Sequence, residues 1–445
     1  MKSNIDKISR VGLMLFALLL GTQKIMAAAP KMTIQDDWKV KVAVGDTSAV
    51  FDIAPPEIIR VTDEKHDSLP VFNPKMPGYR RGVAPKMVRA QECSVAGATM
   101  TDTFVVKAAP EADAKRFVTG VDYQIDPWGT FGRLEGGAIT DKMPVYVTYD
   151  YVPMRLDSVV LSNGRLSLLP GKPHVSLPEP PPLTNNMKRV ANIWISGPMT
   201  KLGEANLYPV LLYPVLEAVY PEPSKPAVAV AAKLLPKSWK KLENGEKIRI
   251  LAWGDSVTDA NYLPNKDDRW QVQFVERLRK RFPKAEIELI TEAWGGRNTT
   301  AYKNEPPGSP KNYKEKVLDL KPDLIVMEFV NDSWLKKPQL DEAYGKIRDE
   351  FHEIGAEWII LTPHYVRPDW MGLTSCRDCD DDPREYVKAV REFGTANNIA
   401  VADAAKRYGH LWREGIPYLT LMMNNINHPN AAGMKIFADA LMELF

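Results

Sequence analysis

The chain has 445 residues, about three times the length of a typical domain, so two or more domains are expected. Its composition, 44% hydrophobic and 26% charged with no periodic glycine or proline, excludes a fibrous or disordered protein. A formal net charge of +2 gives no indication of nucleic-acid binding through bulk charge.

Residues 1–28 have the pattern of a secretory signal peptide. A basic start with Lys2 and Arg10 precedes the apolar run 11–20, and the small residues 27–29 offer cleavage sites. A membrane anchor is disfavoured because about ten apolar residues fall short of the roughly 20 that span a bilayer, and no cysteine follows to carry a lipid. We therefore expect a secreted or periplasmic protein with no membrane span after signal removal.

The next part of the chain has the alternation of β-strands. Short runs in which every second residue is apolar are separated by turn signals such as the Asp-Pro-Trp-Gly sequence at 126–129. The clearest runs are 38–44, 103–106, 145–151 and 190–195. Period-two patterning with this spacing is typical of a sandwich of two sheets. We predict an all-β sandwich domain over residues 30–214.

Two proline-rich segments, 178–182 and 221–226, are expected to be stiff and extended. Proline lacks the backbone donor and restricts the residue before it, so neither segment favours a helix or an inner strand. We place the domain boundary near the second segment and assign residues 215–244 to a linker and a leading helix.

After residue 245, apolar strands alternate with amphipathic helices. The expected strands are 248–253, 285–290, 324–330, 358–361 and 399–402. The expected helices are 270–282, 312–320, 339–354, 383–397 and 430–444. This alternation is typical of a parallel sheet covered on both faces. It predicts a doubly wound, flavodoxin-like three-layer αβα domain over residues 245–445.

Polar residues gather where these strands end, which is where open parallel sheets bind ligands. The segments are Gly254-Asp255-Ser256, Trp294-Gly295-Gly296-Arg297-Asn298, Asn331-Asp332 and, before the last helix, 425–430 with His428. A serine, a glycine N–H, an asparagine amide and a histidine are the groups that acyl transfer needs. Ser256 taken alone could also simply cap a helix.

Four such blocks in this order resemble the SGNH, or GDSL-like, hydrolase superfamily, and the resemblance covers residues 245–445. It implies that Ser256 is the nucleophile and His428 the general base. The implied oxyanion hole consists of the backbone N–H groups of Ser256 and Gly296 and the side chain of Asn331, with Gly295 as an alternative to Gly296. Such a mechanism requires no metal and no organic cofactor.

One position departs from the superfamily pattern. The residue three before the histidine is usually an Asp that orients the imidazole, whereas here it is Asn425. An amide oxygen can fix the tautomer of the ring but brings no charge. Asn425 or a backbone carbonyl is the preferred orienting group. Asp403 could instead swing in, although capping a helix is the simpler role for it, or the site could be degraded or reused.

The segment after the fourth strand suggests a substrate. It contains His364, Arg367, Asp369 and Trp370. An Arg could bind a carboxylate and a Trp could stack on a sugar face, and Arg297 could add a second positive charge. This would suit an anionic glycan. The structural alternative is that Arg367 and Asp369 pair with one another.

The chain contains only three cysteines, of which Cys376 and Cys379 are close in sequence. They could form a local disulfide or bind a metal. A zinc site needs four ligands, and no second pair of Cys or His lies nearby, so no metal is expected.

Together these patterns predict an exported serine esterase that removes acetyl or other small acyl groups from a polysaccharide or oligosaccharide. No long apolar lid is evident around Ser256. The alternatives are a lipid ester or thioester hydrolase, and a catalytically inactive glycan-binding protein. Neither nucleic acid nor a membrane is expected as a partner, and the oligomeric state is left open.

Overall fold

The computed structural model describes residues 29–211 and 229–445 and divides the chain into two compact units. The first unit runs to Arg89, resumes at Ser94 and includes Trp412–Ile416. The second unit contains the short segment Ala90–Cys93 and the rest of the described chain after residue 228. The predicted signal peptide and the second proline-rich segment lie outside the described residues.

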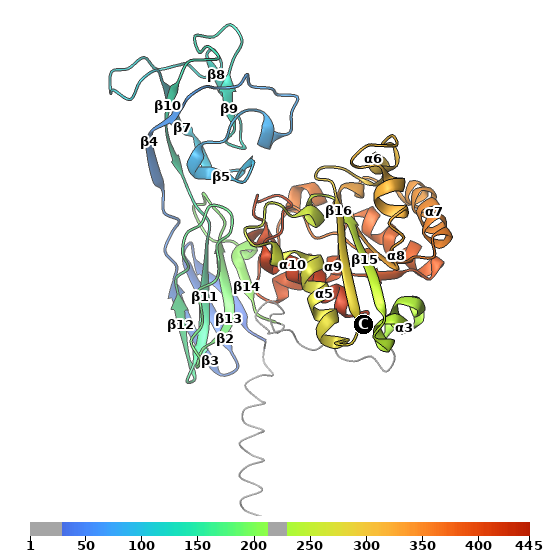
Figure 1. The fold of residues 1–445 in the computed structure, drawn as a ribbon. Coiled ribbons are helices and arrows are strands. Elements are labelled where there is room, and N and C mark those ends of the chain that lie inside the picture. The colour runs from blue at the N-terminus through green and yellow to red at the C-terminus, as the bar shows by residue number, and fades with distance from the viewer. Residues whose placement is uncertain (1–28, 212–228) are drawn as a thin grey trace, which may run out of the picture. The chain divides into compact units, whose positions relative to one another are not determined.

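The first unit is built from antiparallel sheets (Figure 1). One sheet has the order β1-β2-β3, formed by β1 (Lys31–Asp36), β2 (Lys39–Val44) and β3 (Thr47–Asp52). Another has the order β12-β11-β13-β14, formed by β11 (Arg155–Ser162), β12 (Arg165–Leu169), β13 (Lys188–Ile195) and β14 (Leu207–Pro209). Alternate residues such as Val40, Val42, Val159 and Ile193 form one buried core from both sheets. The predicted sandwich is confirmed for these two sheets.

The first unit also contains strands outside the sandwich. The third sheet has the order β4-β10-β7, formed by β4 (Ile59–His66), β7 (Thr99–Lys107) and β10 (Val145–Tyr151). In this unit the short strands β8 (Tyr123–Ile125) and β9 (Phe131–Arg133) also pair. The short strands β5 (Arg89–Ala90) and β6 (Cys93–Ser94) pair at the two ends of the segment Ala90–Cys93, which belongs to the second unit. Alternation identified strand 145–151 but could not show which sheet it joins.

The second unit contains a five-stranded parallel sheet in the order β16-β15-β17-β18-β19. Its strands are β15 (Lys247–Gly254), β16 (Glu286–Ala293), β17 (Leu324–Glu328), β18 (Glu357–Leu361) and β19 (Ala400–Ala402). Every residue of β17 is buried, as expected for an inner strand covered on both faces. The predicted flavodoxin-like order is confirmed, with β15 at the point where the chain direction across the sheet reverses.

Helices cover both faces of this sheet (Figure 1). They are α2 (Val230–Leu234), α3 (Pro236–Asn244), α4 (Ser256–Asp259), α5 (Trp270–Arg281), α6 (Thr299–Lys303), α7 (Lys337–Glu353), α8 (Glu385–Asn397), α9 (Ala404–His410) and α10 (Ala431–Met442). The predicted helix at 312–320 is a π-helix over Lys314–Leu318. Helix α5 packs on α10, where Arg277 and Asp439 form an ion pair of 2.6 Å, and α7 packs on α8, where the Tyr344 and Tyr386 hydroxyls lie 2.7 Å apart.

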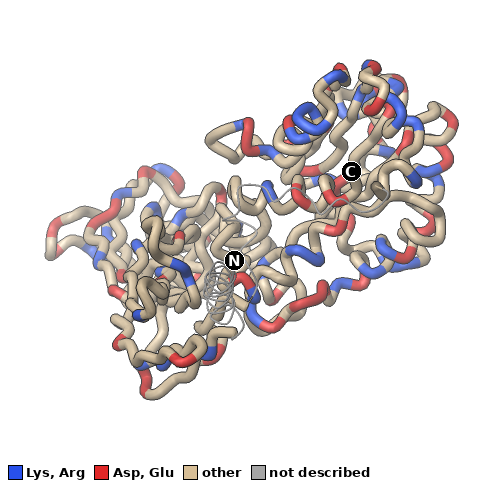
Figure 2. The backbone as a smooth tube through the Cα atoms, turned by 90° about the horizontal axis from the view of Figure 1, so that it is seen from below, with Lys and Arg blue, Asp and Glu red and all other residues tan. Residues whose placement is uncertain are grey.

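Basic and acidic residues are interspersed along the backbone of both units (Figure 2), in agreement with the small net charge. The described part of the chain contains no helix with the length and hydrophobicity that a membrane span requires.

Strand β15 ends in a glycine because nothing larger fits there. A Cβ atom on Gly254 would lie 2.4 Å from the Glu328 carbonyl oxygen of β17 and 2.0 Å from the Thr258 Oγ1. We expect Gly254→Ala to lower the free energy of unfolding by about 1–3 kcal/mol, measured as a lower thermal midpoint. The matched control is Gly345→Ala in α7, where a Cβ meets nothing within 4 Å. This control should stabilise the protein by about 0.5–1 kcal/mol. A midpoint for Gly254→Ala equal to that of the wild type would contradict the packing argument.

Candidate active site

Ser256 is the first residue of the short helix α4, directly beyond the end of the central strand β15. Asp255 stands between them, fully buried, and its carboxylate accepts a hydrogen bond of 3.1 Å from the Val257 N–H. Asp255 therefore caps the helix, which was the structural alternative considered for Ser256. The hydroxyl of Ser256 is not needed for capping.

Asn331 is tied to the same carboxylate. It lies in the 3₁₀ turn η6 (Val330–Asp332) after β17, the strand beside β15. Its backbone N–H and its side-chain Nδ2 donate to Asp255 Oδ2 over 2.9 Å and 2.8 Å. One hydrogen of the amide is thereby fixed in direction, and the amide has a second hydrogen. This second hydrogen is the one that a developing oxyanion could use.

Three carboxyl groups are buried beneath this edge of the sheet: Asp255, Glu328 and Asp332. Burial, together with the neighbouring charge of Asp332, raises the pKa of Asp255 to about 7. Burial raises the pKa of Asp332 to about 6, and burial and the charge of Asp255 raise the pKa of Glu328 well above its ordinary value. Burial therefore favours the neutral form of all three carboxyl groups.

Two glycines follow β16, and one of them lies near the serine. A Cβ on Gly295 would be 3.7 Å from the Ser256 Cβ, an ordinary contact distance. Gly296 has φ +73°, a conformation that favours glycine. Gly295 is thus the glycine whose backbone lies near Ser256, and the assignment of an oxyanion N–H to Gly296 stays a prediction.

His428 is carried by a loop that is fixed by hydrogen bonds. The Oδ1 of the buried Asn424 accepts from the N–H groups of Ile426, Asn427 and His428 over 3.0, 2.9 and 3.0 Å. The loop is also tied to the segment after β18, because the Arg367 N–H donates to the Ile426 carbonyl over 2.8 Å.

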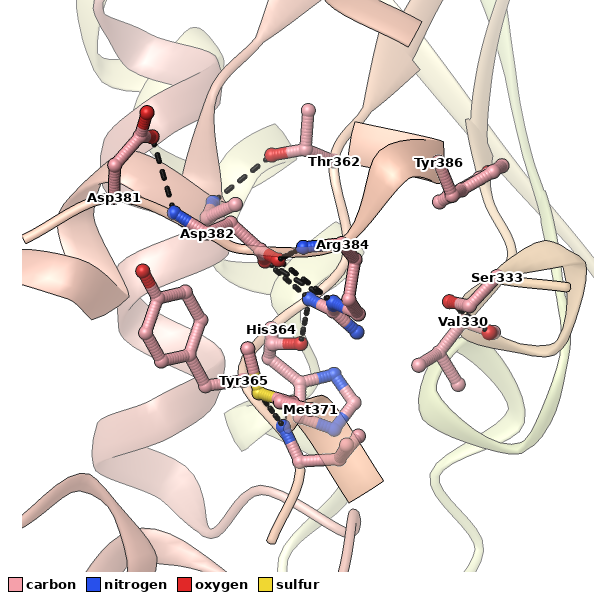
Figure 3. A network of polar contacts seen from close by, with 12 residues as sticks. Val330, Ser333, Thr362, His364, Tyr365, Met371, Asp381, Asp382, Arg384 and Tyr386 are labelled. Atoms are coloured by element: carbon pink, nitrogen blue, oxygen red, sulfur yellow. Dashed lines mark hydrogen bonds and ion pairs between the residues drawn. The ribbon is translucent and has the colours of Figure 1, made fainter. Parts of the chain in front are cut away.

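His364 provides a second tie to this loop. It is fully buried, and its Nε2 lies 2.7 Å from the Asn427 carbonyl oxygen. Burial and the nearby Arg384 lower the pKa of His364 to about 3, so the ring is neutral and donates from Nε2. Figure 3 shows Arg384 bonded both to the His364 carbonyl and to Asp382. His364 was expected to contact substrate, but its side chain is closed off from solvent and supports the His428 loop.

The His428 ring has three neighbours that the sequence analysis missed. Tyr262 stacks on it with ring centroids 4.3 Å apart and an interplanar angle of 1°. The Nδ1 atom lies 2.7 Å from the Gln91 Oε1 and 3.9 Å from the Glu92 Oε1. Gln91 and Glu92 belong to the segment Ala90–Cys93 of the second unit. No sequence signal could have found them, since 337 positions separate Gln91 from His428.

The other candidates for orienting the histidine have different surroundings. Asp403 caps α9 by accepting from the Lys406 N–H over 3.1 Å and pairs with Arg391, so its interpretation as a helix cap is confirmed. Asn425 is buried and has φ +56°. Its role in orienting His428, like the pairing of Ser256 with His428, stays a prediction.

Among the other predicted substrate-binding residues, two pair with one another and two are exposed to solvent. Arg367 forms an ion pair with Asp369, which is the structural alternative proposed for them and weakens the case for an anionic glycan. Trp370 is 46% exposed, and the exposed Arg297 places its guanidinium 5.1 Å from the centre of the Trp294 ring. A second exposed tryptophan, Trp334 at 53%, follows η6 and was missed.

Cys376 and Cys379 are buried and present as free thiols. Within residues 29–211 and 229–445, no three or more His, Cys, Asp or Glu side chains are grouped as a metal site.

Part of the second unit resembles known proteins. Residues 252–436 match the model of the GDSL-like Lipase/Acylhydrolase family, so the predicted resemblance is confirmed over these residues. No match was found among the curated proteins.

Several solved structures are similar to part of the chain. A two-domain esterase (CEX) active on acetylated mannans has 16% identity and a TM-score of 0.38, over 47% of this chain and 52% of that one. This chain thus spans about half the length of that esterase. A Geobacillus acetyl-xylooligosaccharide esterase has 19% identity and a TM-score of 0.36, over 44% of this chain and 94% of the other. The acetyl xylan esterase AlAXEase has 20% identity and a TM-score of 0.35, over 43% and 97%.

The raised pKa of Asp332 predicts how stability depends on pH. Between its ordinary value of 3.8 and about 6, the folded protein binds more protons than the unfolded chain, so the free energy of unfolding falls as pH rises, for this residue by on the order of 3 kcal/mol. Asp332→Asn removes this contribution. In urea unfolding, the variant should therefore lose less stability than the wild type between pH values of about 4.5 and 7.5. The exposed control Asp319→Asn should leave the difference unchanged, and an unchanged difference in Asp332→Asn would refute the shift.

Proposed function

We propose that this protein is an exported serine esterase that removes acetyl or other small acyl groups from a polysaccharide, with Ser256 as nucleophile and His428 as general base. The observation that carries the proposal is the arrangement around Asp255. This carboxylate caps the helix that begins at Ser256 and also holds the Asn331 amide. The family match of residues 252–436 supports the reaction class, and the signal-peptide pattern of residues 1–28 supports export.

In the first half of the reaction, Ser256 Oγ attacks the acyl carbonyl carbon and its proton passes to His428 Nε2. The bond from Oγ to carbon forms as the carbonyl π bond opens, and negative charge develops on the carbonyl oxygen. The N–H groups of Ser256 and of Gly296 or Gly295, with the Asn331 amide, donate to this oxyanion. Donors that are already in place stabilise the transition state without reorganisation.

The tetrahedral intermediate then collapses. The bond between carbon and the sugar oxygen breaks, and the sugar oxygen takes the proton from the His428 imidazolium, which leaves an acyl group on Ser256. Water repeats the cycle, with His428 accepting its proton and returning it to Ser256 as the acid departs. The scheme uses only side chains and backbone of this chain.

Two exposed tryptophans favour a sugar substrate. Trp334 comes after the turn η6 that follows β17, and Trp370 lies in the turn η7 (Pro368–Met371) in the segment after the adjacent strand β18. The flat apolar face of an indole packs well against the apolar face of a sugar ring. These residues support a glycan over a long acyl chain as the part of the substrate that extends from the site.

Substitutions of Ser256 and Asn331 test the proposed ester hydrolysis. Ser256→Ala should abolish acetate release from an aryl acetate and from acetylated polysaccharide. Asn331→Ala should lower kcat about 10²–10³-fold, because one oxyanion donor is lost. The exposed Asn304→Ala is the control and should retain wild-type activity. Equal acetate release by the wild type and Ser256→Ala would disprove the esterase and leave the inactive glycan-binding alternative.

Substitutions of the two exposed tryptophans test the preference for a glycan substrate. Trp370→Ala and Trp334→Ala should raise KM for acetylated polysaccharide while leaving kcat/KM for an aryl acetate nearly unchanged, because the lost surface contacts only the glycan. Ile58→Ala, an equally exposed apolar residue in the first unit, is the control. Unchanged KM values in both variants, with faster hydrolysis of long-chain acyl esters or thioesters than of acetylated sugars, would favour a lipid ester or thioester hydrolase.

A further inference from the structure

The Nδ1 atom of His428 contacts a residue outside the histidine loop. Gln91 Oε1 lies 2.7 Å from it, and Glu92 Oε1 lies 3.9 Å from the same atom. We propose that Gln91 is the positioning residue for His428 and that Glu92 supplies the negative charge that stabilises the protonated ring, so that the two neighbours together replace the acid of a Ser-His-Asp triad. This inference rests on the proposed function.

The contact with Gln91 selects the tautomer of the ring. An amide oxygen accepts hydrogen bonds and cannot donate them, so the 2.7 Å contact requires a hydrogen on Nδ1. In the neutral ring, the lone pair is then on Nε2, the nitrogen that must accept the serine proton. Gln91 therefore does the orienting work of the missing aspartate without its charge.

Glu92 is placed to supply that charge. An opposite charge within about 4–6 Å favours the protonated form of a titratable group. The side chain of His428 is 14% exposed and that of Glu92 is 40% exposed, so solvent only partly screens the pair.

Two further titratable groups lie near the ring or its loop, and neither carries a positive or negative charge at neutral pH. Tyr262, which follows α4, covers one face. His364, which follows β18, contacts the preceding Asn427 carbonyl and is uncharged. Glu92 is thus the carboxylate that faces Nδ1.

The backbone at Gln91 indicates that the side chain is required there. Gln91 has φ +57° in the two-residue turn between β5 and β6, a conformation that Gly or Asn adopts more easily. A glutamine in a left-handed turn costs folding free energy that glycine would not. The cost is consistent with a residue retained for its amide.

The unfavourable turn also offers a variant that should fold. Gln91→Gly removes the amide and fits the positive φ, so its thermal midpoint should equal or exceed that of the wild type. We expect kcat for an aryl acetate to fall about 10–100-fold with little change in KM, as for an outer residue that orients a catalytic one. Wild-type kcat in a folded Gln91→Gly variant would overturn the positioning role.

The pH profile separates orientation from charge. His428 must be neutral to act as base, so the acid limb of kcat/KM reports its titration. Gln91→Glu adds a carboxylate at Nδ1 and should move this limb to higher pH by about one unit. Glu92→Gln removes a carboxylate and should move it to lower pH by about half a unit. The exposed controls Gln35→Glu and Glu57→Gln make the same charge changes in the first unit and should leave the limb in place.

A readout that does not need activity distinguishes this inference from the proposed function. The ¹⁵N chemical shifts of the His428 ring, assigned with a His428→Gln variant, give its tautomer and its titration directly. We expect the Nδ1–H tautomer in the wild type and the same two opposite shifts in Gln91→Glu and Glu92→Gln. If these appear in a protein without Ser256-dependent hydrolysis, the proposed function fails and the inference about His428 stands. An Nε2–H tautomer, or a titration that neither variant moves, would overturn the inference.

Discussion

The buried carboxylate of Asp255 is the interaction on which the site depends. It accepts from the Val257 N–H and from both the backbone and the side chain of Asn331, so it joins the helix after β15 to the turn after β17. Without these hydrogen bonds, the segment that contains Ser256 and the turn that contains Asn331 would not be connected through Asp255. Gly254 is needed next to Asp255, because only a glycine allows the end of β15 to lie so close to Glu328 and Thr258.

Burying carboxyl groups has an electrostatic cost, which the fold reduces by protonation and hydrogen bonding. Glu328 accepts from the Thr258 hydroxyl at 3.3 Å and has a strongly raised pKa, while Asp332 accepts from Thr299 and the Tyr344 hydroxyl. A buried neutral group is also used beside the histidine loop, where the uncharged His364 ring donates a hydrogen bond to the Asn427 carbonyl. Hydrogen bonds between buried side chains thus hold the segments that contain Ser256, Asn331 and His428.

An aspartate in a Ser-His-Asp triad both orients the histidine and supplies a negative charge, whereas separate residues lie around His428. Gln91 contacts Nδ1, Glu92 brings a carboxylate near it and Tyr262 covers the face of the ring. The asparagine at position 425 therefore does not by itself indicate a catalytically inactive protein. It indicates that orientation and charge must come from elsewhere in the fold, and the segment Ala90–Cys93 contains groups of both kinds.

The sequence by itself predicted the five strands of the second unit and their parallel arrangement, because periodicity is local. It also offered Ser256, Gly295, Gly296 and Asn331 as candidates, because the carboxyl ends of parallel strands meet at one edge. Only the tertiary structure decided which side chains are exposed and which are paired. His364 is buried, Arg367 is paired with Asp369, and Trp334 is exposed. Gln91 reaches His428 across 337 positions. Such contacts arise from packing between distant segments, and local patterns of polarity carry no record of them.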